Sequence, residues 1–483
     1  MKQSNQPALS AEGIPAEDLL EQLRRLHTAD VAWQDGKVWS LVYHANEEHD
    51  QLLKAAYSEY FSTNYLNPLA FRSLQKMEQE VVGMAANLFH GDGEVVGTMS
   101  SGGTESLLLA VYTYREWAKK HRPRIHSPEI VAPATIHPAF DKAAHLFGLR
   151  IRKAPVDEGQ RAIPAEMERL INENTILIAA SAPSYPNGIL DPIEEIGQIA
   201  SRRNLPFHVD ACIGGFMLPW VERLGNALPA WDFRVPGVSS ISADVHKFGY
   251  GAKGASVILY KNMSYLRHQF FITTDFPGGI YASPTLLGTR PGGAIAAAWA
   301  GMKHLGEAGY LALAKQLMEG AVRLRQALEN LPEIRIIGEP CMNIFSFTTR
   351  QNKPDIFVVA DQLENKGWMV DRQQFPDSIH LTLLPTNVEV IGQYVDDLKV
   401  ALAFAKAHPE ATAQGNAALY GLMARIPFRG MVEKNVRKIF EEMHGGRTGE
   451  NNEAEVEKSG ALAETAAWMG WASRILAGWK RWF

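Results

Sequence analysis

The sequence is poor in cysteine, with only Cys212 and Cys341 among its 483 residues. Two cysteines are too few for a disulfide framework or a structural zinc site, and such scarcity is typical of a reducing compartment. Strong net charge is lacking as well, because the formal charge is only -5 at pH 7. A charge of this size provides no general field for nucleic acid. We therefore predict neither a metal site nor a nucleic-acid partner.

Long apolar runs are also missing. The first twenty residues lack the basic start and the apolar run of a signal peptide, and no later stretch reaches the length of a membrane-spanning helix. Hydrophobic residues make up 46% and charged residues 21% of the chain, which are ordinary values for globular domains. We therefore expect a soluble, cytoplasmic protein with a large buried core.

The middle of the chain alternates short apolar runs with helical patterns. Strands are predicted over residues 130–132, 150–156, 175–180, 205–209, 238–243 and 256–260, with helices over 138–147 and 192–203 between them. Asp191 is expected to cap the second of these helices. Strands that alternate with helices favour an α/β domain with a mainly parallel sheet and right-handed crossovers.

Four parts are predicted along the chain. Residues 1–70 form an N-terminal arm, 71–330 a large domain, 331–443 a smaller α/β domain, and 444–483 a linker with a tail. Further helices are predicted over 16–26, 48–60, 74–89, 107–117 and 311–330, with an alanine-rich helix ending near 304 and a strand-like run over 37–44. Residues 270–293 form a predicted long loop, and long loops inside compact domains tend to be functional.

A glycine pair opens one of the helical patterns. Residues 100–106 read Ser-Ser-Gly-Gly-Thr-Glu-Ser and precede the apolar helix over 107–117. Small residues at a helix start let backbone amides approach an anion, and the helix dipole favours negative charge there. The same residues are equally typical of a glycine turn with a Ser or Thr cap. A phosphate cradle and a simple helix start both remain open at this point.

Polar side chains follow three of the predicted strands. His137 follows the first strand, Asp210 ends another, and His246 and Lys247 follow a third. Because ligands of open α/β sheets bind beyond the carboxyl ends of the strands, we expect these side chains to converge. A single His or Asp is more often structural, but three strand ends beside a glycine-rich helix start favour a functional site.

Lys247 is the strongest candidate for chemistry. It lies in residues 240–254, after a buried strand and before a glycine-broken loop. A lysine that reacts through its amine must lose a proton near neutral pH, which requires surroundings that disfavour the ammonium ion. We expect such surroundings here, whereas most lysines are solvated surface charges.

Several segments resemble the pyridoxal-phosphate enzymes of the aspartate-aminotransferase fold type (fold type I), within the group II decarboxylase branch. They are residues 101–106, 208–216, 240–254, 278–284 and 288–293. The first two are shared across the branch, whereas the tyrosine-containing run 278–284 and the Ala-Lys-Gly at 252–254 are more specific to the sphingosine-1-phosphate lyases. The similarity extends from about residue 36 to about residue 440, and residues 419–423 resemble the lyases more loosely.

The resemblance implies a set of cofactor contacts. Lys247 would hold pyridoxal 5'-phosphate covalently and later act as an acid-base group, Asp210 would pair with the pyridinium nitrogen, and His137 would stack on the ring. The cofactor phosphate would lie beside Gly102, Gly103, Thr104 and His246. Tyr281 and Ser283 would reach the site from a partner subunit, which makes a homodimer obligatory for activity.

The resemblance also implies a reaction. A lyase of this kind cleaves the C2–C3 bond of sphingosine 1-phosphate by retro-aldol chemistry, giving a long-chain aldehyde and phosphoethanolamine. The substrate phosphate needs cations or hydroxyl donors, and the resemblance assigns Tyr43, Asn64 and Lys253 to it. By periodicity alone, Tyr43 is more typical of a core residue.

One departure from the lyase pattern concerns the substrate phosphate. The lyases usually carry Asn-x-Leu-His-Pro, whereas residues 64–68 of this chain read Asn-Tyr-Leu-Asn-Pro, so Asn67 replaces the histidine. Asparagine donates a hydrogen bond without a positive charge, and charge-assisted bonds are roughly twice as strong. The replacement predicts weaker phosphate binding or a different amino substrate.

The C-terminal segment suggests a contact of its own. Residues 444–460 are glycine-rich and charged, as in flexible linkers. In residues 461–483 apolar side chains recur at helical spacing beside basic ones: Trp468, Trp471, Arg474, Ile475, Trp479, Lys480, Arg481 and Trp482. Such a helix is too short to span a bilayer and suits either the membrane interface or packing on the protein or its partner. Our hypothesis is that the tail brings the enzyme to a lipid substrate.

Two other functions compete with the lyase. An amino-acid decarboxylase of the same branch typically uses an arginine in the loop that holds Arg290 for the substrate carboxylate, so Arg290 alone does not discriminate. Lys253 and the tyrosine-containing run favour the lyase. A non-catalytic membrane-associated scaffold is the remote alternative, because Lys247, Asp210 and His137 complete a catalytic set.

Overall fold

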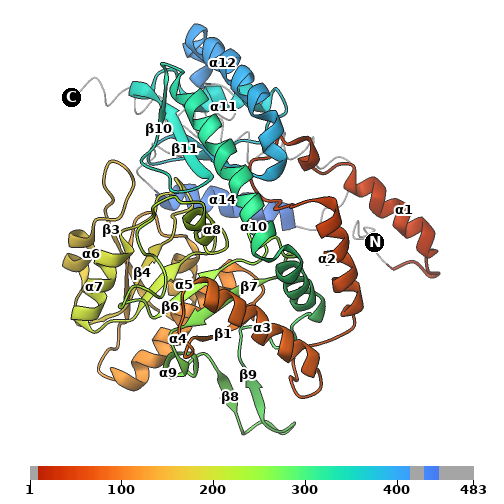
Figure 1. Ribbon diagram of the computed structural model, residues 1–483, viewed down its shortest axis with the longest axis vertical. Helices are drawn as coiled ribbons and strands as arrows, with labels where there is room; N and C mark the ends of the chain where they lie inside the picture. Colours follow the sequence, from red (N-terminus) through yellow and green to blue (C-terminus); the bar gives the residue numbers. More distant parts are fainter. Residues whose placement is uncertain (1–8, 414–428, 445–483) are drawn as a thin grey trace, which may run out of the picture.

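The computed structural model describes residues 9–413 and 429–444, which two sheets of different size organise (Figure 1). The larger sheet occupies the lower lobe of the view and the smaller sheet the upper lobe. Helix α10 (Gly292–Glu329) runs between the lobes. The predictions for residues 419–423, for the linker at 445–460 and for the tail at 461–483 lie outside the described residues.

Seven strands form the large sheet, in the order β1-β7-β6-β5-β4-β2-β3. Their bounds are β1 (Val96–Ser100), β2 (Glu129–Pro133), β3 (Arg150–Ala154), β4 (Thr175–Ser181), β5 (Phe207–Asp210), β6 (Ser240–Ala243) and β7 (Ser256–Tyr260). Neighbours from β3 to β6 are parallel, whereas β7 pairs antiparallel with both β6 and β1. The predicted mainly parallel α/β sheet is confirmed, and β1 is a strand that the sequence patterns do not predict.

Helices cover both faces of the large sheet. Alternate residues of β2 show this, because Ile130 packs in one apolar cluster with Leu107 of α4, while Val131 packs in the other cluster with Val81 of α3. Burial on both faces explains why these strands read as continuous apolar runs. The helices of this lobe are α2 (Glu47–Glu59), α3 (Arg72–Leu88), α4 (Gly103–His121), α5 (Ala139–Phe147), α6 (Pro164–Leu170), α7 (Ile193–Arg203), α8 (Leu218–Arg223) and α9 (Met263–Leu266).

The smaller sheet is antiparallel, in the order β10-β11-β13-β12. Its elements are β10 (Ile334–Ile336), β11 (Ile344–Thr349), α11 (Ile356–Glu364), β12 (Asp371–Gln373), β13 (Ser378–Thr382) and α12 (Ile391–Ala407), followed by α14 (Arg429–His444). Short 3-10 turns complete the chain: η1 (Trp33–Asp35), η2 (Arg350–Asn352), η3 (Pro385–Val390) and η4 (Pro409–Ala413). The predicted domain boundary at 330 and 331 falls between α10 and β10, and the division into domains stays a prediction.

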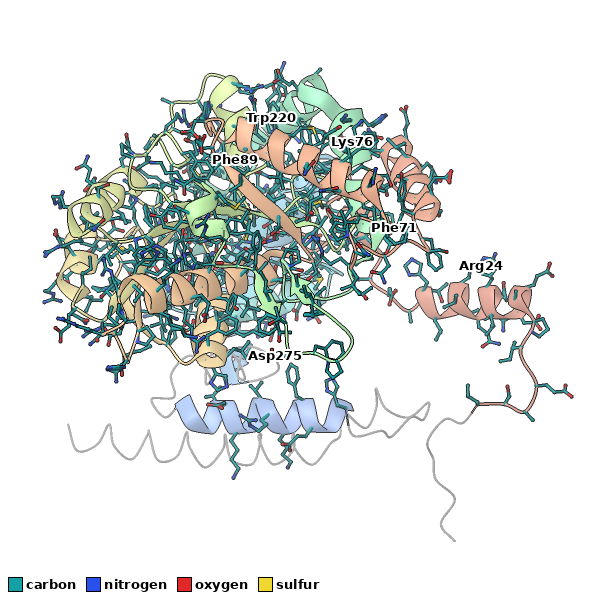
Figure 2. All side chains as sticks on the ribbon, turned by 90° about the horizontal axis from the view of Figure 1, so that it is seen from below. Arg24, Phe71, Lys76, Phe89, Trp220 and Asp275 are labelled. Carbon is teal, nitrogen blue, oxygen red and sulfur yellow. The ribbon has the colours of Figure 1, made fainter. Side chains whose placement is uncertain are left out.

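Two segments stand away from the large lobe. The strands β8 (Phe271–Thr273) and β9 (Tyr281–Ser283) form an antiparallel hairpin, so the long loop predicted over 270–293 is in part a hairpin. This hairpin leaves Phe276 and Ile280 exposed. Helix α1 (Ala16–His27) has no buried residue and lies apart from the body (Figure 2).

Two local predictions are wrong, and one is confirmed. Residues 37–44 form only an isolated bridge instead of a strand, because Trp39 packs into the small lobe against Trp368, with ring centres 5.9 Å apart. Asp191 does not cap α7, since its carboxylate accepts the amides of residues 162 and 181. The alanine-rich helix predicted to end near 304 is confirmed, because α10 breaks at Gly306, whose φ of 54° is left-handed, before the helix predicted over 311–330.

Candidate active site

Three strand ends of the large sheet meet at one cavity of about 110 Å³. His137 beyond β2, Asp210 at the end of β5 and Lys247 beyond β6 all line it. The remaining lining residues are Ser181, Pro183, Tyr185, Cys212 and Ile213. The predicted convergence of these strand ends is therefore confirmed, because parallel strands bring their carboxyl ends to the same edge of the sheet.

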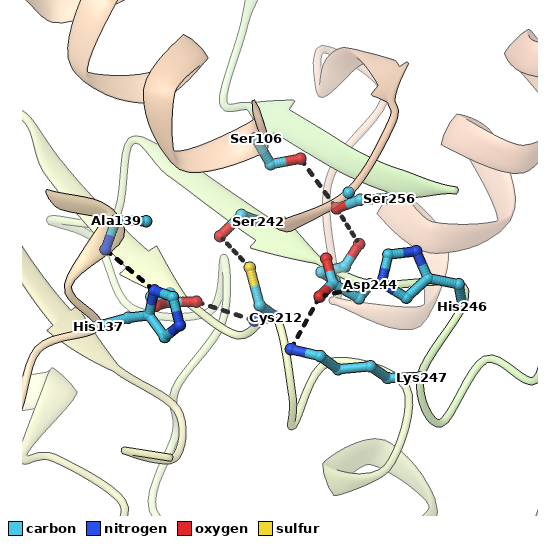
Figure 3. A network of polar contacts seen from close by, with 12 residues as sticks. Ser106, His137, Ala139, Cys212, Ser242, Asp244, His246, Lys247 and Ser256 are labelled. Carbon is cyan, nitrogen blue, oxygen red and sulfur yellow. Dashed lines mark hydrogen bonds and ion pairs between the residues drawn. The ribbon is translucent and has the colours of Figure 1, made fainter. Parts of the chain in front are cut away.

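Lys247 forms an ion pair inside this site (Figure 3). Its Nζ lies 2.9 Å from Oδ2 of Asp244, a residue only 2% exposed. Burial opposes the positive charge, but attraction to Asp244 and to smaller partners outweighs it, so the pKa of Lys247 is raised. The expectation that the surroundings of Lys247 disfavour the ammonium ion is therefore wrong, because a buried carboxylate stabilises it.

Asp210 is fixed by the turn that follows β5. Its Oδ1 accepts the backbone amide of Cys212 at 3.0 Å, which orients the carboxylate beside the cavity. Below it, the Cys212 thiol donates to Ser242 Oγ at 3.3 Å, and both ring nitrogens of His208 bond serine hydroxyls, those of Ser240 and Ser242. Burial lowers the pKa of His208 to about 3, so this histidine is neutral. The side chains beneath the end of β5 therefore form an uncharged, hydrogen-bonded layer.

His137 is fixed at the start of α5. Its Nδ1 accepts the backbone amide of Ala139 at 3.1 Å (Figure 3). A nitrogen that accepts carries no proton, so in the neutral ring the proton lies on Nε2. The ring is thus held in one tautomer and one orientation at the wall of the cavity.

The glycine pair lies where α4 starts, close to the lysine loop. A Cβ on Gly103 would lie 2.7 Å from Asp244 Oδ2, and one on Gly102 would lie 3.2 Å from Cε1 of His246. The glycines therefore allow this loop to approach the helix start. Oδ1 of Asp244 has no hydrogen-bond partner within the described residues. Thr104, in the same turn, is exposed.

A second cavity, of about 380 Å³, contains Tyr43 and Lys253. Lys253 Nζ lies 5.1 Å from the centre of the Tyr43 ring and donates to the carbonyls of Leu41 and His246 at 3.0 and 3.2 Å. Burial, and then repulsion from Lys247, lower the pKa of Lys253. Lys253 shares the cavity with Lys54 and Asp50 and lies six residues beyond Lys247 in the sequence.

The hairpin residues lie outside both cavities. Tyr281 is exposed, and Ser283 is buried and donates to the carbonyls of Thr285 and Leu287. No hydrogen bond or ion pair joins Tyr281 or Ser283 to Lys247 within residues 9–413 and 429–444. The roles implied for these two residues stay predictions.

The asparagines predicted to bind the substrate phosphate cap their own turn. Oδ1 of Asn64 accepts the amide of Leu66, and Oδ1 of Asn67 accepts the amide of Leu69. Asn67 is exposed. Within the described chain, no hydrogen bond joins either asparagine to Lys253. Their contribution to a phosphate site stays a prediction.

Arg290 is already paired inside the protein. Its Nη1 lies 2.5 Å from Oε1 of Glu78 and donates to the Met99 carbonyl at 3.3 Å. The guanidinium also lies over the Tyr65 ring, 4.4 Å from its centre. Glu78 and Arg290 are 9% and 7% exposed. A buried pair of this kind keeps the arginine from meeting a free carboxylate.

Sequence reasoning missed two residues of the site. Tyr185 lines the first cavity and packs against His380 of the small lobe, with ring centres 4.4 Å apart. Burial first, and then the charge of Asp371, raise its pKa to about 12, so the hydroxyl keeps its proton. Tyr185 follows β4, so the strand-end rule could have found it. Asp244 lies within residues 240–254, but its spacing alone did not reveal the ion pair.

The residues of this site fit pyridoxal phosphate. Lys247 offers an amine for the aldehyde carbon, Asp210 a carboxylate for the ring nitrogen, and His137 a ring face. The start of α4 offers free amides and the positive end of a helix for a phosphate. The unpartnered Oδ1 of the buried Asp244 marks a place for one further donor. Within the described chain, His, Cys, Asp and Glu form no cluster of three or more that could hold a metal ion.

Comparisons with known proteins agree with this chemistry. The family model of the pyridoxal-dependent decarboxylase conserved domain matches residues 1–350. The sphingosine-1-phosphate lyase 1 of Rattus norvegicus is 41% identical over 435 residues, which cover 89% of this chain and 76% of the rat protein. The probable lyase of Legionella pneumophila is 36% identical, over 81% of this chain and 67% of its own.

Solved structures give the same grouping. The structure of a Burkholderia pseudomallei sphingosine-1-phosphate lyase superposes with a TM-score of 0.80 at 40% identity, covering 84% of this chain and 94% of that one. A glutamate decarboxylase of Lactobacillus brevis superposes with a TM-score of 0.72 at 19% identity, over 83% of this chain and 95% of its own. The second likeness establishes the fold alone, which is the predicted fold type I.

Proposed function

Because the chain belongs to the pyridoxal-dependent decarboxylase family and, within it, to the sphingosine-1-phosphate lyases, we propose how its residues carry out the lyase reaction. The protein is a pyridoxal-phosphate-dependent lyase that cleaves sphingosine 1-phosphate. The break lies between C2 and C3, and the products are a long-chain aldehyde and phosphoethanolamine. The meeting of Lys247, Asp210 and His137 at one cavity supports this proposal most strongly.

Three residues of the first cavity, and the residues around the start of α4, have proposed tasks. Lys247 binds the cofactor and, once released, carries a proton at Nζ beside Asp244. Asp210 keeps the ring nitrogen protonated, and His137 covers the ring. When bound, the cofactor accepts the electron pair that the breaking C2–C3 bond leaves on C2. Gly102, Gly103, Thr104 and His246 surround the cofactor phosphate, with Ser283 of a second chain.

The second cavity is the proposed site of the substrate phosphate. Lys253 supplies the positive charge and Tyr43 a hydroxyl, and both lie in the same cavity. The turn that holds Asn64 and Asn67 adds neutral donors. Because Asn67 brings no charge, the phosphate relies on Lys253 for its ionic attraction.

A homodimer is the proposed working form. The hairpin exposes Phe276 and Ile280, and large apolar side chains exposed together favour a protein interface. In such a dimer Tyr281 enters the partner's cavity and acts there on the substrate. This arrangement accounts for the absence of polar contacts between Tyr281 and the site of its own described chain.

The amino-acid decarboxylase reading loses support from the position of Arg290. An arginine that receives a substrate carboxylate has to be accessible, whereas Arg290 is buried against Glu78. Breaking such a pair leaves an uncompensated charge, which costs about 3–5 kcal/mol. Arg290 is therefore a structural cation in this proposal.

Location is the remaining part of the proposal. No helix among the described residues is long and apolar enough to cross a membrane. We propose that the enzyme is cytoplasmic and that residues 461–483 contact a membrane peripherally. Removing these residues should abolish co-sedimentation with liposomes, and unchanged pelleting would contradict the membrane role.

Turnover tests the function directly. The purified protein, loaded with pyridoxal phosphate, is incubated with sphingosine 1-phosphate, and long-chain aldehyde and phosphoethanolamine are followed by mass spectrometry. Both products are expected from the wild type. Neither product is expected from samples without substrate or from Lys247→Ala. Carbon dioxide from an amino-acid panel, without aldehyde, would assign the protein to the decarboxylases. Absence of any turnover would favour the scaffold.

A further inference from the structure

The loop that joins Lys247 to Lys253 adopts an uncommon backbone conformation. Tyr250 has a φ of 53°, in the left-handed region that costs a non-glycine residue free energy. Two internal bonds hold the turn, since the Tyr250 amide donates to the Lys247 carbonyl at 2.9 Å and the Gly251 amide to the Val245 carbonyl at 2.8 Å. A strained turn persists only where its surroundings fix it.

Two side chains from outside the loop bind the carbonyls of two consecutive residues of this turn. His49 of α2 bonds the Tyr250 carbonyl through Nε2 at 2.9 Å, and Tyr310 of α10 donates its hydroxyl to the Gly249 carbonyl at 2.8 Å. Both side chains are buried. Two consecutive peptide groups of the turn are therefore held by helices far apart in the sequence.

The His49 ring makes this bond as its one hydrogen bond within the described residues. A carbonyl only accepts, so Nε2 carries the proton, and the buried Nδ1 has no hydrogen-bond partner in that part of the chain. Burial, with the nearby His304, lowers the pKa of His49 and keeps the ring neutral. A buried polar atom without a partner destabilises the folded protein. Packing alone would therefore favour an apolar residue at position 49.

We propose that His49 and Tyr310 are positioning residues that fix the spacing between the cofactor lysine and the substrate-phosphate lysine. The roles of Lys247 and Lys253 rest on the proposed function. Lys253 strengthens the same turn, because its Nζ donates to the His246 carbonyl. Holding the Gly249 and Tyr250 carbonyls therefore sets both amines at once, one for each cavity.

His49→Leu and His49→Gln form a matched pair of tests. Leucine removes the donor, whereas the glutamine amide can place a donor near the position of Nε2. In His49→Leu we expect a roughly tenfold higher KM for sphingosine 1-phosphate and a roughly tenfold higher half-saturation concentration of pyridoxal phosphate. The latter is read from cofactor absorbance in the apoenzyme, without turnover. His49→Gln should restore both values to within about threefold of the wild type.

Tyr310→Phe tests the second contact without changing the packing. It removes the hydroxyl from Gly249 and keeps the ring that stacks on Trp220. Tyr394→Phe is the control, because the Tyr394 hydroxyl is buried and has no hydrogen-bond partner within the described residues. We expect a rise of about threefold to tenfold in both constants for Tyr310→Phe and no rise for Tyr394→Phe.

The outcomes separate this inference from the proposed function. Unchanged constants in His49→Leu and Tyr310→Phe would overturn the inference, as would a His49→Gln variant as impaired as His49→Leu. If His49→Leu fails to fold, the constants measured for Tyr310→Phe still test the inference. A wild type that binds the cofactor but does not cleave sphingosine 1-phosphate would contradict the proposed function. The half-saturation concentration of the cofactor would still report whether His49 and Tyr310 position Lys247.

Discussion

The cavity of Lys247 and the hairpin of Tyr281 differ in how complete they are within one chain. Around Lys247, side chains at the carboxyl ends of β2, β5 and β6 already make the contacts that orient them. On the hairpin, Tyr281 and its apolar neighbours are exposed. The sheet preorganises the first region, whereas the second region leaves apolar side chains exposed to solvent. The difference teaches that one chain already orients Lys247, Asp210 and His137, whereas the roles proposed for Tyr281 and Ser283 call on a second chain.

Loss of Lys247 should have the largest effect on the preorganised region. Lys247→Ala removes the amine that binds the cofactor, so we expect turnover to fall by about 10⁴-fold or more. The absorbance band of covalently bound cofactor should vanish in the same variant. Lys261→Ala, a lysine outside both cavities, is the control and should retain both. Residual turnover within tenfold of the wild type would remove Lys247 from its role.

A charge on the hairpin should damage the second region instead. Ile280→Asp places a carboxylate in the proposed interface, where desolvation weakens association by several kcal/mol, on the order of 10³-fold in the dimer dissociation constant. Light scattering should detect monomers, and the turnover per subunit should decrease as the protein is diluted. Val400→Asp, at an exposed position of α12, should remain dimeric. A dimeric and active Ile280→Asp would show that the hairpin does not hold the subunits together.

Glu78→Gln tests the buried ion pair between α3 and the loop that follows the hairpin. Glu78 lies on α3 and binds both the Met99 amide and Arg290, beyond the hairpin. Removing its charge leaves Arg290 buried without a counterion, so we expect a loss of about 3 kcal/mol in the free energy of unfolding. Chemical denaturation measures it, with Glu80→Gln on the same helix as a control that changes much less. Equal stabilities of the two variants would show that the buried pair is not a structural link.

Asn67→His should have the smallest effect. A protonated imidazole adds a charge-assisted bond, so we expect KM for the phosphorylated substrate to fall about threefold at pH 6. An ordinary histidine has a pKa near 6.5, so it loses its proton as pH rises and the gain should disappear by about pH 8. Asn67→Gln should show no such pH dependence. An unchanged KM at pH 6 would place Asn67 away from the substrate phosphate.

Strand ends were predictable from the sequence because the parallel sheet enforces their convergence. The alternating pattern identified β2, β5 and β6, and with them His137, Asp210 and Lys247. The charge state of Lys247 was not predictable, because it depends on the 2.9 Å approach of Asp244, which spacing in the sequence does not fix. The hairpin that holds Tyr281 was not predictable either, because the glycines, prolines and aromatics of residues 270–293 are equally typical of an irregular loop.

Subunit complementation tests most directly whether one chain supplies Lys247 and its partner supplies Tyr281 to the same site. Lys247→Ala and Tyr281→Ala are each expected to be inactive, and they are co-expressed to form mixed dimers, which tags and light scattering verify. One of the two sites in each mixed dimer then contains both intact residues, so we predict that mixed dimers isolated by their two tags recover about one half of wild-type turnover. Verified mixed dimers that stay as inactive as either parent would contradict the shared site and place Tyr281 in the cavity of its own chain.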